Sequence, residues 1–236
     1  MENKAAVEVV RTLFDEGLIR TWYRHQKQGW TLRSGMWSPF YVQLRPLVSK
    51  PKLLGTIGKA LANLIQHECT AVSRVVGVAM AGIPIAVSTS LSSGIPAAYT
   101  RKVIRADDSS RPVYGEHSLI EGDLQDRDVV AIIDDVVTRF DSKLEAIEQL
   151  QHEADRLSIE ISCHDVCVVV NRLQTQVPSG IRLHSLVQLT PDKVDTLKPF
   201  LLSREYEVIV EYLKNPQSFQ DAGIQNALCR QAEKKS

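Results

Sequence analysis

The chain lacks the features that would place it in a membrane or on nucleic acid. No apolar run approaches the ~20 residues that a membrane-spanning helix needs. Its 28 basic and 28 acidic residues cancel, so the net charge gives no sign of a basic surface that would bind nucleic acid. The first residues form a charged, amphipathic segment that is unlike a signal peptide. We therefore expect a cytoplasmic protein without a nucleic-acid or membrane partner.

Cysteine is also sparse, with four scattered residues at Cys69, Cys163, Cys167 and Cys229. Cys163, His164 and Cys167 could be considered as metal ligands, but they open an apolar stretch and no second pair accompanies them. Buried thiols are the better interpretation. We expect no metal ion held directly by protein side chains.

What the chain does contain is an alternation of apolar strands and amphipathic helices, typical of α/β proteins. Its 236 residues and 44% hydrophobic content fit one domain over residues 1–236. The pattern predicts short strands within residues 30–44 and further strands near residues 74–78, 96–99, 129–133, 165–170 and 184–187. It predicts helices at residues 4–18, 19–28, 52–67, 83–91, 142–153, 191–201 and 204–214, then a polar tail at 216–236 that frays from Arg230.

The most informative stretch is residues 129–142. Its apolar, β-branched start predicts a strand buried on both faces of a parallel sheet. Asp134 and Asp135 follow at the carboxyl end of that strand, where α/β folds bind their ligands. After a short Thr/Ser-bearing turn, Ser142 is expected to cap a helix, with Glu145 three residues on. Because free N–H groups at a helix start bind anions, the carboxylates and this turn suggest a phosphorylated sugar.

This stretch resembles the phosphoribosyl-diphosphate (PRPP) motif of type I phosphoribosyltransferases, in which two acidic residues follow a hydrophobic strand and precede a Thr/Gly/Ser loop. The resemblance implies that the acidic pair contacts the ribose hydroxyls and that the loop N–H groups hold the 5-phosphate. Where family members carry small residues, often glycine, this chain has Arg139, Phe140 and Asp141. Phe140 hinders the close backbone approach that glycine permits. Asp141 adds like charge beside a phosphate, and Arg139 offsets part of it.

Two earlier segments resemble orotate phosphoribosyltransferases. Residues 32–42 resemble their amino-terminal signature, a Lys-Ser-Gly-x-x-Ser-Pro-aromatic pattern, with Arg33 at the usual lysine. The aromatic residues of this turn could equally form a small apolar cluster, and both interpretations can hold together. Residues 75–86 resemble the strand, small-residue turn and helix that bind pyrophosphate through the backbone.

Two further segments follow in the same family's order. Residues 95–105 resemble a strand and the start of a mobile catalytic loop, with Arg105 where relatives have a second lysine. We expect residues 106–118 to form this mobile lid over the pyrophosphate. Residues 165–174 resemble the strand whose following arginine, here Arg172, contacts the orotate carboxylate.

The resemblance implies a type I phosphoribosyltransferase fold, a central mainly parallel sheet flanked by helices with a small hood at residues 19–45. It implies a homodimer that converts orotate and PRPP to orotidine 5'-monophosphate and pyrophosphate in pyrimidine (UMP) biosynthesis. Mg²⁺ is the implied cofactor, held through PRPP near Asp134 and Asp135. The implied catalytic residues are Lys102, Arg101 and Arg105. The implied PRPP-binding residues are Arg33, Met80, Ala81, Asp134, Asp135, Val136, Val137, Thr138, Arg139, Phe140, Asp141 and Ser142. The implied orotate-binding residues are Tyr41, Val42, Thr138 and Arg172.

Two competing interpretations stay open. A phosphoribosyltransferase for a planar base without a carboxylate would leave Arg33 and Arg172 unpaired, which counts against it. A non-catalytic regulator that senses PRPP or a nucleotide on the same fold is favoured by the altered loop at residues 139–141.

Overall fold

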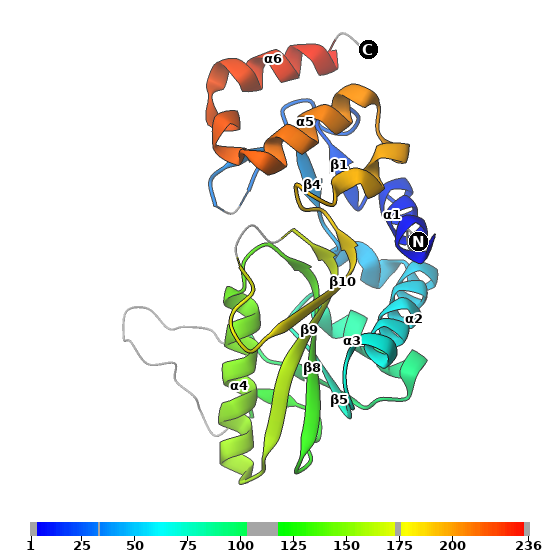
Figure 1. Cartoon of the computed structure of the whole chain (residues 1–236), viewed down its shortest axis with the longest axis vertical. Coiled ribbons are helices and arrows are strands. Elements are labelled where there is room, and N and C mark those ends of the chain that lie inside the picture. The colour runs from blue at the N-terminus through cyan, green and yellow to red at the C-terminus, as the bar shows by residue number, and fades with distance from the viewer. Residues whose placement is uncertain (1–3, 33, 103–117, 173–175, 234–236) are drawn as a thin grey trace. The chain divides into compact units, whose positions relative to one another are not determined.

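The computed structural model describes residues 4–32, 34–102, 118–172 and 176–233 (Figure 1). The chain divides into two compact units, Leu47–Leu186 and a second assembled from Met1–Pro46 and Val187–Ser236. The expectation of a single domain over residues 1–236 stays a prediction. Among the described residues, no helix has both the length and the apolar character needed to cross a membrane.

A six-stranded sheet forms the centre of the larger unit, in the order β10-β9-β8-β5-β6-β7. β5 pairs in parallel with β6 and β8, β8 pairs in parallel with β9, and β7 is antiparallel to β6. The mainly parallel α/β sheet expected from the sequence is therefore confirmed. The strands are β5 (Arg74–Gly77), β6 (Ala97–Thr100), β7 (Ile120–Glu121), β8 (Asp128–Val137), β9 (Ile161–Asn171) and β10 (Arg182–Gln188).

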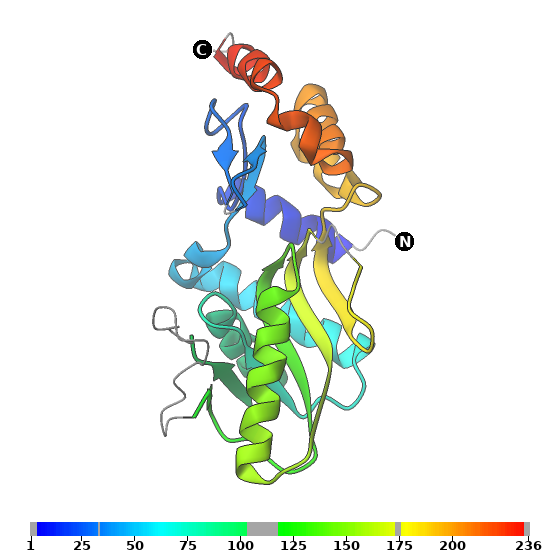
Figure 2. The same ribbon diagram turned by 90° about the vertical axis from the view of Figure 1, so that its left-hand side faces the viewer.

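Helices cover both faces of this sheet (Figures 1 and 2). α4 (Asp141–Leu157) lies on one face, and α2 (Pro51–Glu68) and α3 (Gly82–Ser93) lie on the other. The short 3₁₀ helix η1 (Arg45–Ser49) precedes α2 in the chain. Most apolar side chains of β8 and β9 are buried, among them Ile132, Ile133 and Val168, as expected for strands covered on both faces. The core on the α4 side includes Val130, Ile132, Val166, Val168, Ala146 and Leu150.

The smaller unit holds two short antiparallel strand pairs and most of the carboxyl-terminal helices. β1 (Ile19–Thr21) pairs with β4 (Phe40–Val42), and β2 (Trp30–Thr31) pairs with β3 (Trp37–Ser38). These pairs confirm the short strands expected within residues 30–44. The helical segments are α1 (Lys4–Asp15), η2 (Val194–Phe200), α5 (Ser203–Lys214), η3 (Pro216–Gln220) and α6 (Ala222–Glu233).

Three expectations for this unit are wrong. Residues 19–28 begin with strand β1 and not with a helix, because Ile19 and Thr21 are buried on alternate positions opposite β4. Residues 191–201 contain the 3₁₀ helix η2, which has Pro199 inside it, in place of an α-helix. The fraying expected from Arg230 onward is wrong for the described residues, since η3 and α6 occupy 216–233 and Arg230 lies within α6.

Aromatic contacts explain why the last segment is ordered. Trp37 stacks on Phe219 with ring centroids 6.5 Å apart, and Phe40 meets Tyr212 edge-on at 5.9 Å. The Nε1–H of Trp22, which is fully buried, donates to the main-chain oxygen of Leu228 in α6. The apolar cluster expected around the Ser-Pro turn is thus completed by residues almost 200 positions later.

Candidate active site

The larger unit has a topological switch point between β5 and β8. β5 leads through α3 to β6 on one side, whereas β8 leads through α4 to β9 on the other side. The connections therefore diverge from two neighbouring strands, which leaves a crevice at their carboxyl ends in open α/β sheets. Both segments singled out from the sequence for PRPP, the turn after β5 and the acidic end of β8, lie at this point.

Two glycines let the start of α3 approach β8 closely. A Cβ on Gly82 would lie 2.4 Å from the main-chain oxygen of Ile133 and 3.3 Å from Oδ1 of Asp134. A Cβ on Gly77 would lie 2.8 Å from the oxygen of Gly82. Only glycine fits this approach. The structure thereby brings the turn that contains Met80 and Ala81 beside the acidic pair.

The acidic pair occupies the carboxyl half of β8, a central strand. Asp134 is buried, and its Oδ1 accepts the N–H of Asp135 at 2.8 Å. Asp135 is partly buried, and its Oδ1 accepts the N–H of Val136 at 2.7 Å. Burial, reinforced by the neighbouring charge of Asp134, raises the pKa of Asp135 to about 7. Asp135 therefore changes its charge close to neutral pH.

A buried lysine, Lys143 in the first turn of α4, completes this cluster. Its Nζ lies 2.7 Å from Oδ2 of Asp134 and donates to the main-chain oxygen of Val136 at 2.7 Å and to Oγ of Ser142 at 3.2 Å. The side chains of Lys143 and Asp134 are only 4% and 7% exposed. Both carboxylate oxygens of Asp134 are thus engaged by the protein itself, whereas Asp135 has one oxygen beyond its bond to Val136.

The loop after β8 differs from the expectation in two ways. Phe140 turns its side chain into the core against Val137 and Ala146, and is 5% exposed. Helix α4 therefore starts at Asp141, with Phe140 as its N-cap residue and no side-chain cap. The prediction that Ser142 caps the helix is wrong. The helix begins before Ser142, at Asp141, because the buried Phe140 ring holds the N-cap position.

The charged side chains of this loop face solvent. Nε of Arg139 lies 3.6 Å from Oδ2 of Asp141, and the two side chains are 70% and 81% exposed. Thr138 is exposed as well, while Val137 is buried. An exposed ion pair of this length contributes little to stability. The partial charge compensation of Asp141 by Arg139 that the sequence suggested agrees with this contact.

Other predicted site residues are distributed as follows. Arg172, which is buried, lies directly after β9 and donates its backbone N–H to the oxygen of Val137 at 2.8 Å, so it adjoins the acidic loop. Arg101 follows β6, and its Nη1 lies 3.3 Å from Oε1 of Glu121, while Lys102 is exposed. Arg105 and residues 106–117 of the expected lid lie outside the described residues.

The predicted base-binding residues of the hood belong to the smaller unit. Tyr41 lies in β4 and stacks on Trp30 with ring centroids 5.9 Å apart. Val42, in the same strand, is buried. Arg33 lies outside the described residues. The roles assigned to these three residues stay predictions.

Sequence reasoning missed Lys143, although a signal was present. Lys143, Ala146 and Leu150 share one helical face at the spacing of buried residues. A lysine on an apolar face implies a buried partner of opposite charge, and Asp134, already assigned to the site, is that partner.

The chain is similar in sequence to known orotate phosphoribosyltransferases. No protein-family model matches the chain. It is 36% identical over 126 residues to orotate phosphoribosyltransferase from Methanothermobacter thermautotrophicus, covering 53% of this chain and 64% of the relative. It is 31% identical over 141 residues to orotate phosphoribosyltransferase from Thermococcus gammatolerans, covering 60% of this chain and 68% of the relative. The match to the first of these relatives thus spans slightly less than two thirds of its length.

A solved structure gives the same fold. The crystal structure of orotate phosphoribosyltransferase from Aeropyrum pernix superposes with a TM-score of 0.63 at 23% sequence identity. The superposition covers 81% of this chain and 97% of that one.

Proposed function

Because the chain belongs to the orotate phosphoribosyltransferase family, we propose that it transfers the phosphoribosyl group of Mg-bound PRPP to orotate. The products would be orotidine 5'-monophosphate and pyrophosphate, in pyrimidine biosynthesis. The observation that carries the proposal is the Asp134–Asp135 pair, which lies in the carboxyl half of the central strand β8, at the switch point and one short loop before the start of α4.

The proposed reaction is a displacement at the anomeric carbon of PRPP, in which the bond to pyrophosphate breaks and a bond to the orotate nitrogen forms. The developing charges are positive on the ribose and negative on the leaving group. Asp135 would accept hydrogen bonds from the ribose hydroxyls through its carboxylate. Arg101, Lys102 and Arg105 would neutralise the departing pyrophosphate. Positioning and electrostatic stabilisation then lower the barrier, without a covalent intermediate.

Substrate binding would use the backbone as much as side chains. The N–H groups of residues 138–142 at the start of α4 suit the 5-phosphate. The turn at Met80 and Ala81 suits pyrophosphate. Tyr41, Val42 and Arg172 would hold orotate, and Arg33 would contribute a further cation to the substrates.

Mg²⁺ fits this site only through the substrate. It prefers oxygen ligands, but both oxygens of Asp134 are bound to Lys143 and to the Asp135 N–H. Asp135 alone offers a carboxylate oxygen, so the ion would be held mainly by PRPP and would help to neutralise its pyrophosphate. A homodimer and a cytoplasmic location are part of the same proposal, and light scattering of the purified chain tests the dimer.

A non-catalytic regulator is the second candidate function. It is favoured by the ion pair of Lys143 with Asp134, which uses a carboxylate that the family motif assigns to ribose. The exposed side chain of Asp141 adds support for a regulator, because the family motif implies a phosphate near this helix start and an acidic group would repel it.

Calorimetry with Mg-PRPP, followed by an orotate-consumption assay, separates the two candidates. We expect saturable PRPP binding and release of pyrophosphate that depends on orotate. Asp135→Asn should weaken both signals, whereas Asp155→Asn, a like change at the far end of α4, should leave them intact. Binding of PRPP without turnover would favour the regulator, and absence of PRPP binding would contradict both the transferase and a regulator that senses PRPP.

A further inference from the structure

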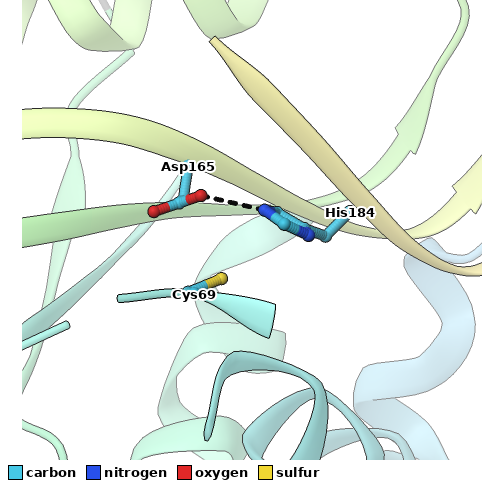
Figure 3. Close-up of side chains that lie close together, drawn as sticks. All are labelled: Cys69, Asp165 and His184. Carbon is cyan, nitrogen blue, oxygen red and sulfur yellow. Dashed lines mark hydrogen bonds and ion pairs between the residues drawn. The ribbon is translucent and has the colours of Figure 1, made fainter. Parts of the chain in front are cut away.

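A second polar cluster lies away from the switch point, where the end of α2 meets β9 and β10. Cys69 follows directly after α2, Asp165 and Cys167 lie in β9, and His184 lies in β10. Figure 3 shows the carboxylate of Asp165 and the ring of His184 side by side, with the sulfur of Cys69 facing them. Potential ligand atoms of Cys69, Asp165 and His184 all lie within 4.8 Å of one another.

Strand geometry adds a fourth ligand. Asp165 and Cys167 are two positions apart in β9, so they share the face that meets α2. Sγ of Cys167 lies 3.8 Å from Sγ of Cys69. Two sulfurs bound to one tetrahedral Zn²⁺ at about 2.3 Å stand about 3.8 Å apart. The two thiols therefore already have the separation that such an ion requires.

The remaining pair needs only a small adjustment. Nε2 of His184 and Oδ1 of Asp165 are 2.8 Å apart and share a proton. A nitrogen and an oxygen bound to one tetrahedral Zn²⁺ stand about 3.3 Å apart, so replacing the proton by the ion opens this pair by about 0.5 Å.

The surrounding charges also suit a divalent cation. Arg182 donates from Nε and Nη2 to the two oxygens of Asp165 at 2.8 and 2.7 Å, which fixes the carboxylate. Two thiolates and one carboxylate carry three negative charges, and one divalent cation with the guanidinium of Arg182 balances them.

We propose that Cys69, Cys167, His184 and Asp165 form a binding site for one thiophilic divalent cation, with Zn²⁺ as the prime candidate. Sulfur and imidazole ligands select such ions over Mg²⁺. Binding would displace the thiol proton of Cys167 and the proton between His184 and Asp165, both of which leave to solvent. Four protein ligands close the coordination shell, so the ion would act structurally, tying the end of α2 to β9 and β10.

Cobalt(II) titration tests the site on the whole chain without an affinity tag, stripped of metal and kept reduced with a phosphine. We expect one equivalent of Co²⁺ to produce tetrahedral d–d bands and a sulfur-to-cobalt charge-transfer band, both abolished by one equivalent of Zn²⁺. Zn²⁺ should also raise the melting temperature. Absence of the charge-transfer band in the wild-type protein would overturn the proposal. Because this measurement uses the wild-type chain, it does not depend on whether a variant folds.

Variants locate the ion. Cys69→Ser and His184→Ala should weaken Co²⁺ binding roughly 100-fold or more. Cys163→Ser is the matched control, because Cys163 precedes the same β9 residues but packs against the core on the α4 side. Asp135→Asn controls for metal at the PRPP motif. An equal charge-transfer band in Cys69→Ser would place the ion elsewhere and refute the proposal, while leaving the proposed transferase activity untouched.

Discussion

Asp135 links ligand binding to pH at the residue scale. Its pKa is raised to about 7 by burial and by Asp134, so a larger share of the molecules carries the carboxylate as pH rises through that value. Only the ionised form accepts hydrogen bonds with both oxygens. We predict that PRPP affinity increases from pH 6 to pH 8, measured by calorimetry at constant ionic strength. In Asp135→Asn that rise should disappear, and a rise of equal size in the variant would contradict the assignment.

The same residue should trade stability for function. A carboxyl whose pKa is higher in the folded than in the unfolded chain stabilises the fold at low pH and loses that contribution as pH rises through about 7. Asp135→Asn removes the cost of ionising a partly buried acid. We therefore expect the difference in unfolding free energy between Asp135→Asn and the wild type to be roughly 1–2 kcal/mol more favourable to the variant at pH 8 than at pH 5. Urea unfolding at both pH values measures this difference, and Asp155→Asn serves as an exposed control.

Lys143 and Asp134 should behave as a coupled pair. Removing one member of a buried ion pair leaves an uncompensated charge and costs roughly 3 kcal/mol or more. We predict such a loss for Lys143→Met, and a double variant Lys143→Met/Asp134→Asn that recovers part of it, because the stranded carboxylate is gone. A double-mutant cycle by urea unfolding gives the coupling, and additive losses would show that the 2.7 Å contact carries no energy.

These residues show which parts of the site could be predicted from the sequence alone. Asp134, Asp135 and Arg172 were assigned by their order after apolar strands, and the structure places them at neighbouring strand ends. The direction of a side chain is a different matter. The order of residues does not show that Phe140 turns into the core, and the helical spacing that predicts a buried Lys143 does not say which carboxylate it meets, because both depend on how α4 packs.

At the scale of elements, the start of α4 decides how a phosphate is received. Asp141 is the first residue of the helix and points into solvent. Its charge would repel a 5-phosphate at the helix start. Replacing both Phe140 and Asp141 by glycine would also empty a core position, so a single change is the cleaner test. We predict that Asp141→Asn lowers the KM for PRPP, in initial-rate assays.

The charge removed must be the one at the helix start for this argument to hold. Glu148→Gln, an exposed position two turns along α4, should leave the KM for PRPP unchanged. A higher KM in Asp141→Asn would mean that the native loop is adapted to its ligand. The same variant should lower the unfolding free energy by only about 0.5 kcal/mol, since it removes the favourable interaction of a first-turn acid with the helix dipole.

Helix α6 provides a test of an element that the sequence did not reveal. Leu228 is buried, whereas Ile224 on the same helix is 40% exposed. We predict that Leu228→Ala costs roughly 2–4 kcal/mol, while Ile224→Ala costs less than about 1 kcal/mol. Thermal and urea unfolding of the two variants measure the difference. Equal, small effects would mean that α6 contributes nothing to the fold.

The elements that were predicted correctly share a physical trait. β5, β6, β8, β9 and β10 were found because apolar runs in a doubly covered sheet stand out from their surroundings. β7 has two residues and β1 three, which is too short for a periodic pattern. α6 was missed because its few buried residues gain their partners, such as Trp22, from the opposite end of the chain.

For the whole molecule, three buried acids with a lowered pKa contribute to the response to low pH. Arg182 lowers the pKa of Asp165, and Arg156 lowers that of Glu153. Burial alone would raise the pKa of Asp128, but hydrogen bonds from Ser73 and Arg74 outweigh it and lower the value. Each acid therefore stabilises the fold above its unfolded pKa of about 4, and the contribution is lost as pH falls further.

We predict that the unfolding free energy declines steeply below about pH 4. Urea unfolding between pH 6 and pH 3 measures the slope, which counts the protons taken up on unfolding. Glu153→Gln should make the decline shallower, since one of the three acids is gone. An unchanged slope in that variant would show that its contacts with Arg156 and Ser118 do not bias its ionisation.

The smaller unit is assembled from two distant parts of the chain, which has a consequence for the order of synthesis. Trp37 and Phe40 leave the ribosome long before Phe219 and Tyr212, the rings that cover them. The contiguous unit Leu47–Leu186 emerges in between and can pair its strands as it appears. At about 5–20 residues per second, the aromatic faces of the first part wait roughly ten seconds or more for their partners. During that interval a nascent chain exposes the surface that chaperones and aggregation compete for, while its sheet is already formed.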